Sequence, residues 1–347
     1  MSNEPDEPMI TSRATMKDVA NVAGVSLKTV SRVINHESNV NEQLVQRVED
    51  AVQKLSYRPN LKARSLRRLD GRSSTIGVLL EDLSNPFSAT IIRAIEEVAT
   101  RRGVSVLAGS LDESADRERS LATSMSSHQV DGMILAPASQ SHDYLARDQH
   151  AGTAFVFVDR PPIDLDADHV LSDNRDGTAR AIDRLLDLGH QRIGFLGDDA
   201  VLWTARERYL GYEEAHRARG LEVASELVHL NVRSSSAASM LVDRMLELSD
   251  PPTAIFASRN ILTIGAVRSL RAHDVERRTA LVGFDDFPLA DLLVPAVSVV
   301  AQEVSMIGRR AAELLFNRLD GDRSATQRVV ISTRYVARGS GEIRPRR

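Results

Sequence analysis

The sequence predicts a small all-helical N-terminal head followed by a larger two-lobed α/β body with parallel sheets. Residues 16–34 have the apolar spacing of two short helices joined by a glycine turn. From Ser74 onward, short apolar runs alternate with amphipathic stretches in two successive sets. A strongly basic stretch, residues 58–72, separates these regions in a chain whose net charge is −4. At 347 residues, the chain is long enough for two or three domains.

Two short helices open the head. Thr15 can cap the first helix through its hydroxyl, with Asp18 as its capping-box partner. Gly24 gives the backbone the freedom that a tight turn needs, and Ser26 can cap the second helix. This spacing is typical of a helix-turn-helix, which places the start of its second helix on base edges in the major groove of DNA. A helical hairpin with a solvated polar face is the alternative interpretation.

A third helix and the basic stretch favour the DNA interpretation. The apolar pattern predicts a helix over 42–55, capped by Asn41. Residues 58–72 hold six basic side chains and one acidic side chain, a net charge of +5, and residues 13–72 have a net charge of +6. The rest of the chain is therefore acidic. A basic head is suited to DNA phosphates, whereas an acidic body would repel them.

The composition excludes several classes of protein. The chain has no cysteine, so disulfides, thiolate nucleophiles and cysteine-bound zinc are excluded. Its nine histidines lack the spacing of a metal site, and no GxGxxG, P-loop or GxSxG motif occurs. No apolar run is long enough to span a membrane, and residues 1–13 lack the features of a secretory signal. We expect no metal, no cofactor, no enzymatic activity, a disordered tail over 1–13 and a cytoplasmic protein.

The body is expected to contain two similar lobes. Strands that alternate with helices predict buried parallel sheets with right-handed crossovers. Two such sets predict two lobes, with a ligand cleft at the carboxyl ends of their strands. We expect the segment 299–303 to cross back to the first lobe before the last helix, 305–319. The expected strands are 76–80, 104–108, 132–136, 154–158, 193–196, 227–230, 254–257 and 281–284, and the other helices are 90–101, 176–188, 206–219, 237–248 and 262–272.

Short motifs occur in a specific order along most of the chain. In the head they are KDVA (17–20), GVS (24–26), TVSRVIN (29–35), YRPN (57–60) and ARSL (63–66). In the body they are NPF (85–87), VDR (158–160), GH (189–190), GFDD (283–286) and Gln302. From about residue 15 to about residue 340, the chain resembles the lactose/galactose-repressor (LacI/GalR) family of bacterial transcription regulators. The resemblance implies a periplasmic-binding-protein-like body and a ligand-controlled repressor that binds operator DNA as a homodimer.

The resemblance also implies which head residues contact DNA. Leu27, Lys28 and Arg32 match the positions that read bases. Lys28 and Arg32 can donate to guanine, and Leu27 can make apolar contact with a thymine methyl group. The positions that match backbone contacts, which fix the register of the protein on DNA, are Lys17, Thr29, Ser31, Asn35, Asn39, Tyr57 and Asn60.

Residues 60–66 match the hinge that becomes helical on operator DNA in this family. A helix this short is unstable alone, so we expect two hinges to form together in a dimer on DNA. Leu66 matches the leucine that wedges into the minor groove, and Ala63 is small enough for close approach of two hinges. Packing of Leu66 on the body is the alternative. After Gly339 there is no leucine heptad, so we expect a dimer and not a tetramer.

The effector pocket is expected between the lobes. Asp159, Arg208 and Asp285 match polar cleft positions, where carboxylates accept bonds from sugar hydroxyls and a guanidinium can bind two oxygens. Phe87 is placed to give an apolar face, and Arg160 and Gln302 are further lining residues implied by the resemblance. A salt-bridge or helix-capping role is the alternative for each of these residues.

Three departures from the family pattern bear on the ligand. Ser88 and Val232 stand where aromatic residues are common, and Arg259 lies where an Asn-Asp pair is common. A purine needs flat stacking surfaces, so a sugar, sugar acid or polyol fits better. Arg259 adds positive charge, which would favour an anionic ligand. A body that senses a phosphorylated metabolite or a protein partner is the alternative function.

The expected domain organisation follows from these motifs. We expect a tail over 1–13, a helix-turn-helix domain over 14–58, a hinge over 59–73 and an effector-binding and dimerisation domain over 74–347. Within that body, lobe 1 is expected to comprise 74–172 and 303–331, and lobe 2 is expected to comprise 173–302 and 332–347.

Overall fold

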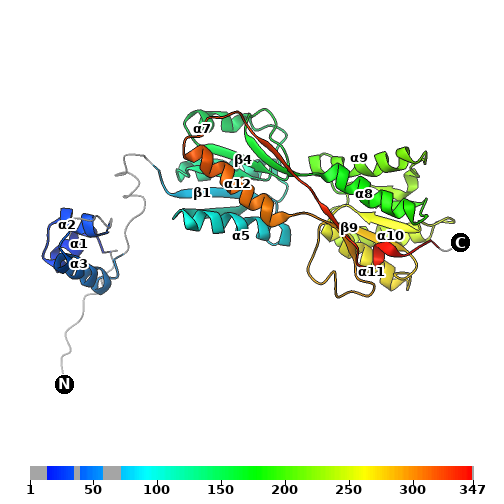
Figure 1. Cartoon of the computed structure of the whole chain (residues 1–347), viewed down its shortest axis with the longest axis horizontal. Helices are drawn as coiled ribbons and strands as arrows, with labels where there is room; N and C mark the ends of the chain where they lie inside the picture. Colours follow the sequence, from blue (N-terminus) through cyan, green and yellow to red (C-terminus); the bar gives the residue numbers. More distant parts are fainter. Residues whose placement is uncertain (1–13, 35–39, 58–71, 346–347) are drawn as a thin grey trace, which may run out of the picture. The chain divides into compact units, whose positions relative to one another are not determined.

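The computed structural model describes residues 14–34, 40–57 and 72–345. The chain divides into two compact units, 1–73 and 74–347, and each is described by itself. The first unit is helical, whereas the second is built of two α/β lobes with mainly parallel sheets (Figure 1). The predicted fold class is therefore confirmed.

The first unit, the head, packs three helices around a small apolar core. They are α1 (Met16–Ala23), α2 (Leu27–Ile34) and α3 (Glu42–Lys54). Thr15 and Asp18 form the expected capping box at the start of α1, and Gly24 ends this helix with a φ of 61°. The core consists of Val19, Ala20, Ala23, Val30, Val33, Val48, Ala51 and Tyr57.

The turn between α1 and α2 is fixed by a residue of α3 that the sequence analysis did not single out. Arg47 donates a hydrogen bond of 2.6 Å from Nη2 to the carbonyl oxygen of Ala23. A second bond of 3.3 Å joins the same nitrogen to the carbonyl of Gly24. These carbonyls end α1 and have no partner within that helix. Arg47 therefore satisfies the end of α1 and ties the turn to α3.

The first lobe contains a six-stranded sheet in the order β11-β5-β4-β3-β1-β2. Helices α5 (Pro86–Arg101) and α12 (Val304–Leu319) pack on one face, where Ile91, Ile95 and Ile307 join the core. Helix α6 (Ala115–Ser127) contributes Ala122 and Met125 to the core of the other face. A short helix, α7 (Ala146–His150), precedes β4. The strands are β1 (Thr75–Leu80), β2 (Ser105–Ser110), β3 (Gly132–Leu135), β4 (Ala154–Val158), β5 (Asp168–Ser172) and β11 (Arg328–Ile331).

The second lobe repeats this strand order, β12-β10-β9-β8-β6-β7. Helices α8 (Asn174–Asp187) and α9 (Trp203–Ala218) cover one face, and α10 (Ser235–Leu246) and α11 (Asn260–Ala272) cover the other. The pairing is parallel except between β10 and β12. The strands are β6 (Ile193–Leu196), β7 (Val228–His229), β8 (Ala254–Ala257), β9 (Ala280–Phe284), β10 (Ser298–Ala301) and β12 (Arg334–Val336). Single 3-10 turns occur at Asp143–Leu145, Ser225–Leu227 and Ser340–Glu342.

The chain passes between the lobes after β5, after β10 and after β11. The expectation for residues 299–303 is wrong in part, because 298–301 form β10, which pairs with β9 and β12 in the second sheet, and the crossing follows this strand. Helix α6 and strand β5 were not predicted. Helix α6 buries only Glu118, Ala122 and Met125, and β5 has only two apolar residues, Val170 and Leu171. Their burial depends on the other elements of the lobe.

Candidate functional site

The start of α2 presents polar and apolar side chains on the surface of the head. Leu27 is 47% exposed, and Lys28 is also exposed. Ser26 Oγ accepts a hydrogen bond of 3.1 Å from the backbone nitrogen of Thr29, which is how the sequence begins this helix. Val30 and Val33 turn inward to the core. This division leaves one face of α2 for contacts outside the head.

The remaining head residues singled out in the sequence have different environments. Lys17 is exposed on α1, and Ser31 and Arg32 are half-buried on α2. Tyr57 is only 8% exposed and belongs to the head core, so its ring packs against apolar side chains. That packing was not expected for a residue assigned to the DNA backbone. Outside the described residues lie Asn35, Asn39, Asn60, Ala63 and Leu66.

All six body residues singled out in the sequence line one cavity at the carboxyl ends of the strands. In each sheet, β1 or its counterpart β6 lies at the point where the strand order reverses, which is where open α/β sheets bind ligands. Asp159 follows β4, and Asp285 follows the corresponding strand β9. Both have a positive φ, 67° and 69°. The lining includes Phe87, Asp159, Arg160, Arg208, Asp285 and Gln302.

Arg208, on α9, is held at the base of the cavity by three groups. Its Nε donates a bond of 2.7 Å to Oδ1 of Asn174. Its Nη1 donates a bond of 2.6 Å to the carbonyl of Ser258. The guanidinium carbon lies 3.8 Å from the centre of the Phe284 ring, a cation–π contact. Three protein groups therefore fix the orientation of the Arg208 side chain.

Asp285 connects this arginine to the crossing between the lobes. Its Oδ2 lies 3.6 Å from Nη1 of Arg208. Its Oδ1 accepts a bond of 2.6 Å from the amide of Gln302, which in turn accepts a bond from the hydroxyl of Ser172. Ser172 ends β5 and Gln302 follows β10, so this chain of bonds joins two of the crossings. Asp285 is thus held by Arg208 of the second lobe and is connected through Gln302 to Ser172 of the first lobe.

Asp159 and Arg160 form the first-lobe side of the cavity. Burial raises the pKa of the Asp159 carboxyl, and the guanidinium groups of Arg160 and Arg208 oppose this shift. Nε of Arg160 lies 3.6 Å from Oδ2 of Asp159. Both Nη atoms of Arg160 bind Glu113, and Nη1 also donates a bond of 2.9 Å to the carbonyl of Pro137. The buried Nε has no hydrogen-bond acceptor among the described residues. It is a donor that a ligand oxygen could satisfy.

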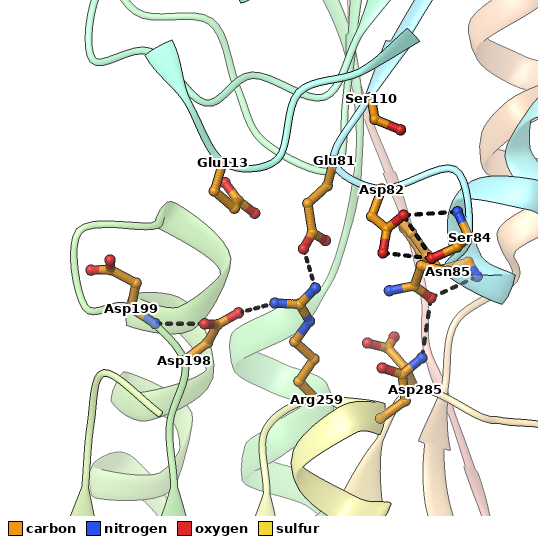
Figure 2. Close-up of polar contacts among 12 residues, drawn as sticks. Glu81, Asp82, Ser84, Asn85, Ser110, Glu113, Asp198, Asp199, Arg259 and Asp285 are labelled. Carbon is orange, nitrogen blue, oxygen red and sulfur yellow. Dashed lines mark hydrogen bonds and ion pairs between the residues drawn. The ribbon is translucent and has the colours of Figure 1, made fainter. Parts of the chain in front are cut away.

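Eight further residues line the cavity, and four of them carry charged or amide side chains; of these four, the sequence analysis connected only Arg259 with the ligand. All four follow strands or begin a helix beside a strand end, so their position in the repeating pattern was the available signal. Figure 2 labels all four and shows Glu81 and Asp198 bound to the guanidinium of Arg259. They are Glu81, Asn85, Asp198 and Arg259.

Arg259 does not supply the free positive charge expected from the sequence. Its Nη1 lies 2.8 Å from Oδ2 of Asp198, and its Nη2 binds Oε1 of Glu81 (Figure 2). Burial raises the pKa of the Glu81 carboxyl, and Arg259 opposes that shift. The argument from Arg259 to an anionic ligand is therefore wrong, because two carboxylates already neutralise this guanidinium.

The described residues contain no cluster of three or more histidine or acidic side chains arranged to hold a metal ion. The helices of the described ranges are all too short or too polar to cross a membrane. Most of the side chains that line the cavity of the body can form hydrogen bonds.

Comparison with known proteins extends these similarities over nearly the whole chain. Residues 15–60 match the model described as bacterial regulatory proteins, lacI family, and residues 182–341 match a periplasmic binding protein-like domain. The chain is 30% identical over 332 residues to the HTH-type transcriptional repressor PurR of Mannheimia succiniciproducens, covering 94% of this chain and 98% of that protein. It is 31% identical over 328 residues to the ribose operon repressor of Halalkalibacterium halodurans, covering 93% of this chain and 96% of that protein.

A solved structure adds a three-dimensional comparison. The transcriptional regulator CelR in complex with cellobiose is 29% identical and has a TM-score of 0.67, with 94% of this chain and 100% of that chain covered. The similarity spans both the helical head and the two-lobed body. The chain therefore belongs to the lacI family of bacterial regulatory proteins and is a DNA-binding transcriptional regulator, not an enzyme.

Proposed function

We propose that the chain is a repressor whose body binds an uncharged, hydroxyl-rich molecule, a sugar or a polyol, in the cavity between its lobes. The observation that carries this proposal is the convergence of Asp159, Asp285 and Arg208 on one cavity. Carboxylates accept hydroxyl protons and a guanidinium donates to hydroxyl oxygens, so these groups together suit a polyol. A site built in this way also rejects analogues that leave its buried polar groups unpaired.

The charges around the cavity favour an uncharged ligand over a sugar acid or a phosphorylated metabolite. Every lining guanidinium already has a carboxylate nearby. The lining carboxylates outnumber the guanidinium groups. An anionic ligand would add to this negative excess and would lose its water shell without gaining a free cation. The acidic lining residues are Glu81, Asp159, Asp198 and Asp285, and the basic ones are Arg160, Arg208 and Arg259.

Two relatives support the same ligand class. One is named as a ribose operon repressor, and the CelR structure is a complex with cellobiose. Little aromatic surface lines the cavity beyond Phe87, which gives a flat base few stacking partners.

We further propose that the head contacts operator DNA through the residues singled out in its sequence. Leu27, Lys28 and Arg32 would contact base edges from α2. The hinge would enter the minor groove with Ala63 and Leu66. Acting on DNA, the protein would work in the bacterial cytoplasm. Backbone contacts are assigned to Lys17, Thr29, Ser31, Asn35, Asn39, Tyr57 and Asn60.

A homodimer formed through the body is the assembly that we propose. Three large apolar side chains are exposed together on the segment that follows β9, where they lie outside the lobe core. Leu289 is 64% exposed, Leu292 is 70% exposed and Val294 is 60% exposed. Exposed apolar clusters of this kind are typical of interfaces, and two copies would match the two halves of a pseudo-palindromic operator.

A thermal-shift series on the full chain tests the ligand class. Neutral sugars and polyols are compared with the matching sugar acids, sugar phosphates and nucleosides. A ligand at about 100 times its Kd stabilises the folded state by about 2.7 kcal/mol, so the cognate compound raises the Tm. We expect a neutral compound to raise it more than its acid or phosphate counterpart. Stabilisation by a phosphate ester or a purine alone would refute the proposal, and no stabilisation by any compound would favour a protein partner.

A further inference from the structure

Arg259 reaches across the cleft from one lobe to the other. It lies between β8 and α11, both in the second lobe. Its guanidinium binds Asp198 of its own lobe and Glu81, which follows β1 of the first lobe (Figure 2). The exposed fractions of these side chains are 17% for Arg259, 13% for Asp198 and 22% for Glu81. The ion pairs are therefore largely shielded from water. Charges attract each other more strongly in such a shielded environment than at the protein surface.

The next residue makes a second contact across the cleft. Nδ2 of Asn260 donates a hydrogen bond of 3.2 Å to Oδ1 of Asn85. Asn85 caps α5, since the same oxygen accepts a bond of 3.1 Å from the backbone nitrogen of Phe87. Two consecutive residues of the second lobe thus hold the beginning of α5 and the end of β1. Both contacts would break if the lobes moved apart.

These contacts divide the cleft into two compartments. The inner compartment, which contains Asp159 and Arg208, leaves about 30 Å³ for the centres of water molecules, and the outer one leaves about 730 Å³. About 10–15 Å³ is needed for one water, so the inner compartment has room for only a few. The residues that line both compartments are Glu81, Asn85, Asp198 and Arg259. A molecule larger than a few waters does not fit in the inner compartment while these contacts hold the lobes in this arrangement.

We propose that Arg259 is a built-in clasp that holds the two lobes closed through Glu81 when no effector is bound. The guanidinium occupies the position between the lobes where a ligand would bridge them. An effector that enters the inner compartment must displace it, so Arg259 competes with the effector for the closed cleft. This inference goes beyond the proposed function, because it concerns the effector-free protein and holds for any ligand class.

The distance between the lobes can be measured directly because the chain contains no cysteine. Two cysteines introduced at exposed positions, Glu96→Cys on α5 and Arg206→Cys on α9, carry spin labels for pulsed electron-electron distance measurements on the full chain. The labelled chain is mixed with an excess of unlabelled chain, so that any dimer contains at most one labelled copy and the measured distance lies within one chain. We expect one short, narrow distance distribution without effector.

Removal of the clasp is expected to open the cleft. Arg259→Ala and Glu81→Gln each shift the distribution to longer distances and broaden it, and the double variant opens no further than either single variant. Arg233→Ala is the matched control. Arg233 also lines the cleft, but its carboxylate partner, Asp199, lies in the same lobe. Its removal should leave the distance unchanged.

Chemical rescue distinguishes the clasp from a general loss of stability. Arg259→Ala leaves a gap between two carboxylates that N-ethylguanidinium, at millimolar concentration, can fill. We expect it to restore the short distance in Arg259→Ala but not in the Arg259→Ala/Glu81→Gln double variant. Circular dichroism verifies that each variant is folded. An unchanged distance in both single variants, or equal opening in Arg233→Ala, would overturn the proposal, as would a failure of N-ethylguanidinium to close a folded Arg259→Ala chain.

Discussion

The amide nitrogen of Gln302 lies 2.6 Å from Oδ1 of Asp285, although 17 residues separate them. The other oxygen of the same carboxylate lies 3.6 Å from Nη1 of Arg208. Asp285 therefore has one oxygen bound at close range and the other only loosely paired. The loosely paired oxygen is the better acceptor for a ligand hydroxyl, because binding there breaks no strong hydrogen bond.

The first prediction concerns Asp285. Asp285→Asn keeps the size of the side chain but removes its charge. Hydrogen bonds to charged groups contribute about 1.5–3 kcal/mol, so we expect effector affinity to fall by roughly ten- to a hundredfold. Isothermal calorimetry with the compound found by thermal shift measures this change.

A neighbouring acid provides the control for this experiment. Asp286 is paired with Arg338, at 2.7 Å from its Nη1, and does not line the inner cavity. Asp286→Asn should therefore leave effector affinity close to that of the wild type. Unaltered binding by Asp285→Asn would exclude this residue from the ligand site.

The second prediction separates base reading from phosphate binding. Arg32→Ala should weaken operator binding and relax the preference at one base position by about 1–3 kcal/mol. Lys17→Ala should weaken binding to all sequences alike. It should also reduce the slope of log affinity against log salt concentration by about one, the contribution of one phosphate contact. Fluorescence anisotropy on operator and random duplexes at several salt concentrations measures both the base preference and the salt dependence of binding. Equal losses on the two duplexes for Arg32→Ala would remove its base-reading role.

The third prediction concerns assembly. Leu292→Asp places a charge on the most exposed of the three apolar side chains that follow β9. A buried, unpaired charge at an interface is costly, so the variant should dissociate at concentrations where the wild type is dimeric. Sedimentation velocity measures the mass. Ile163→Asp, at an exposed apolar position of the first lobe, is the control, and a dimeric Leu292→Asp would place the interface elsewhere.

The fourth prediction concerns acid stability. His190 is fully buried, with Nδ1 at 2.8 Å from the hydroxyl of Thr253 and Nε2 at 2.7 Å from the carbonyl of Ile343. Burial lowers the pKa of this imidazole below 6.5. The unfolded chain therefore binds a proton at a higher pH than the folded chain does. The stabilisation is complete above about pH 6.5 and is lost as the pH falls through the folded-state pKa.

Thermal melts between pH 8 and pH 5.5 test this effect. His190→Gln should lower the Tm at pH 8, because two hydrogen bonds weaken, but it should also reduce the fall in Tm on acidification. His150→Gln, at an exposed position, should leave that fall unchanged. A pH dependence in His190→Gln as steep as that of the wild type would show that other buried groups dominate, such as His142, His216 and His229, whose pKa values burial also lowers.

Several elements have local signals that identify them from the amino-acid sequence alone. Thr15, Asp18 and Gly24 define α1 through caps and a turn that depend on a few adjacent residues. The apolar runs of the central strands are buried on both faces, so hydrophobicity alone located β1, β4 and β8. Order and spacing of short motifs were also enough to indicate the family and six residues of the cavity. Each of these inferences rests on contacts between residues close in the chain or on a resemblance.

Long-range packing sets which residues meet across the cleft, and no local sequence signal shows it. Strand β10 lies within the second sheet because β9 and β12 are there to pair with it, and no local signal distinguishes it from a crossing. Arg259 looked like a free cation in the sequence, yet Glu81, 178 residues away, neutralises it. Whether a charged side chain binds a ligand or a partner depends on distances that long-range packing sets. The distances across the cleft are set by how the two lobes pack, and three crossings of the chain connect these lobes.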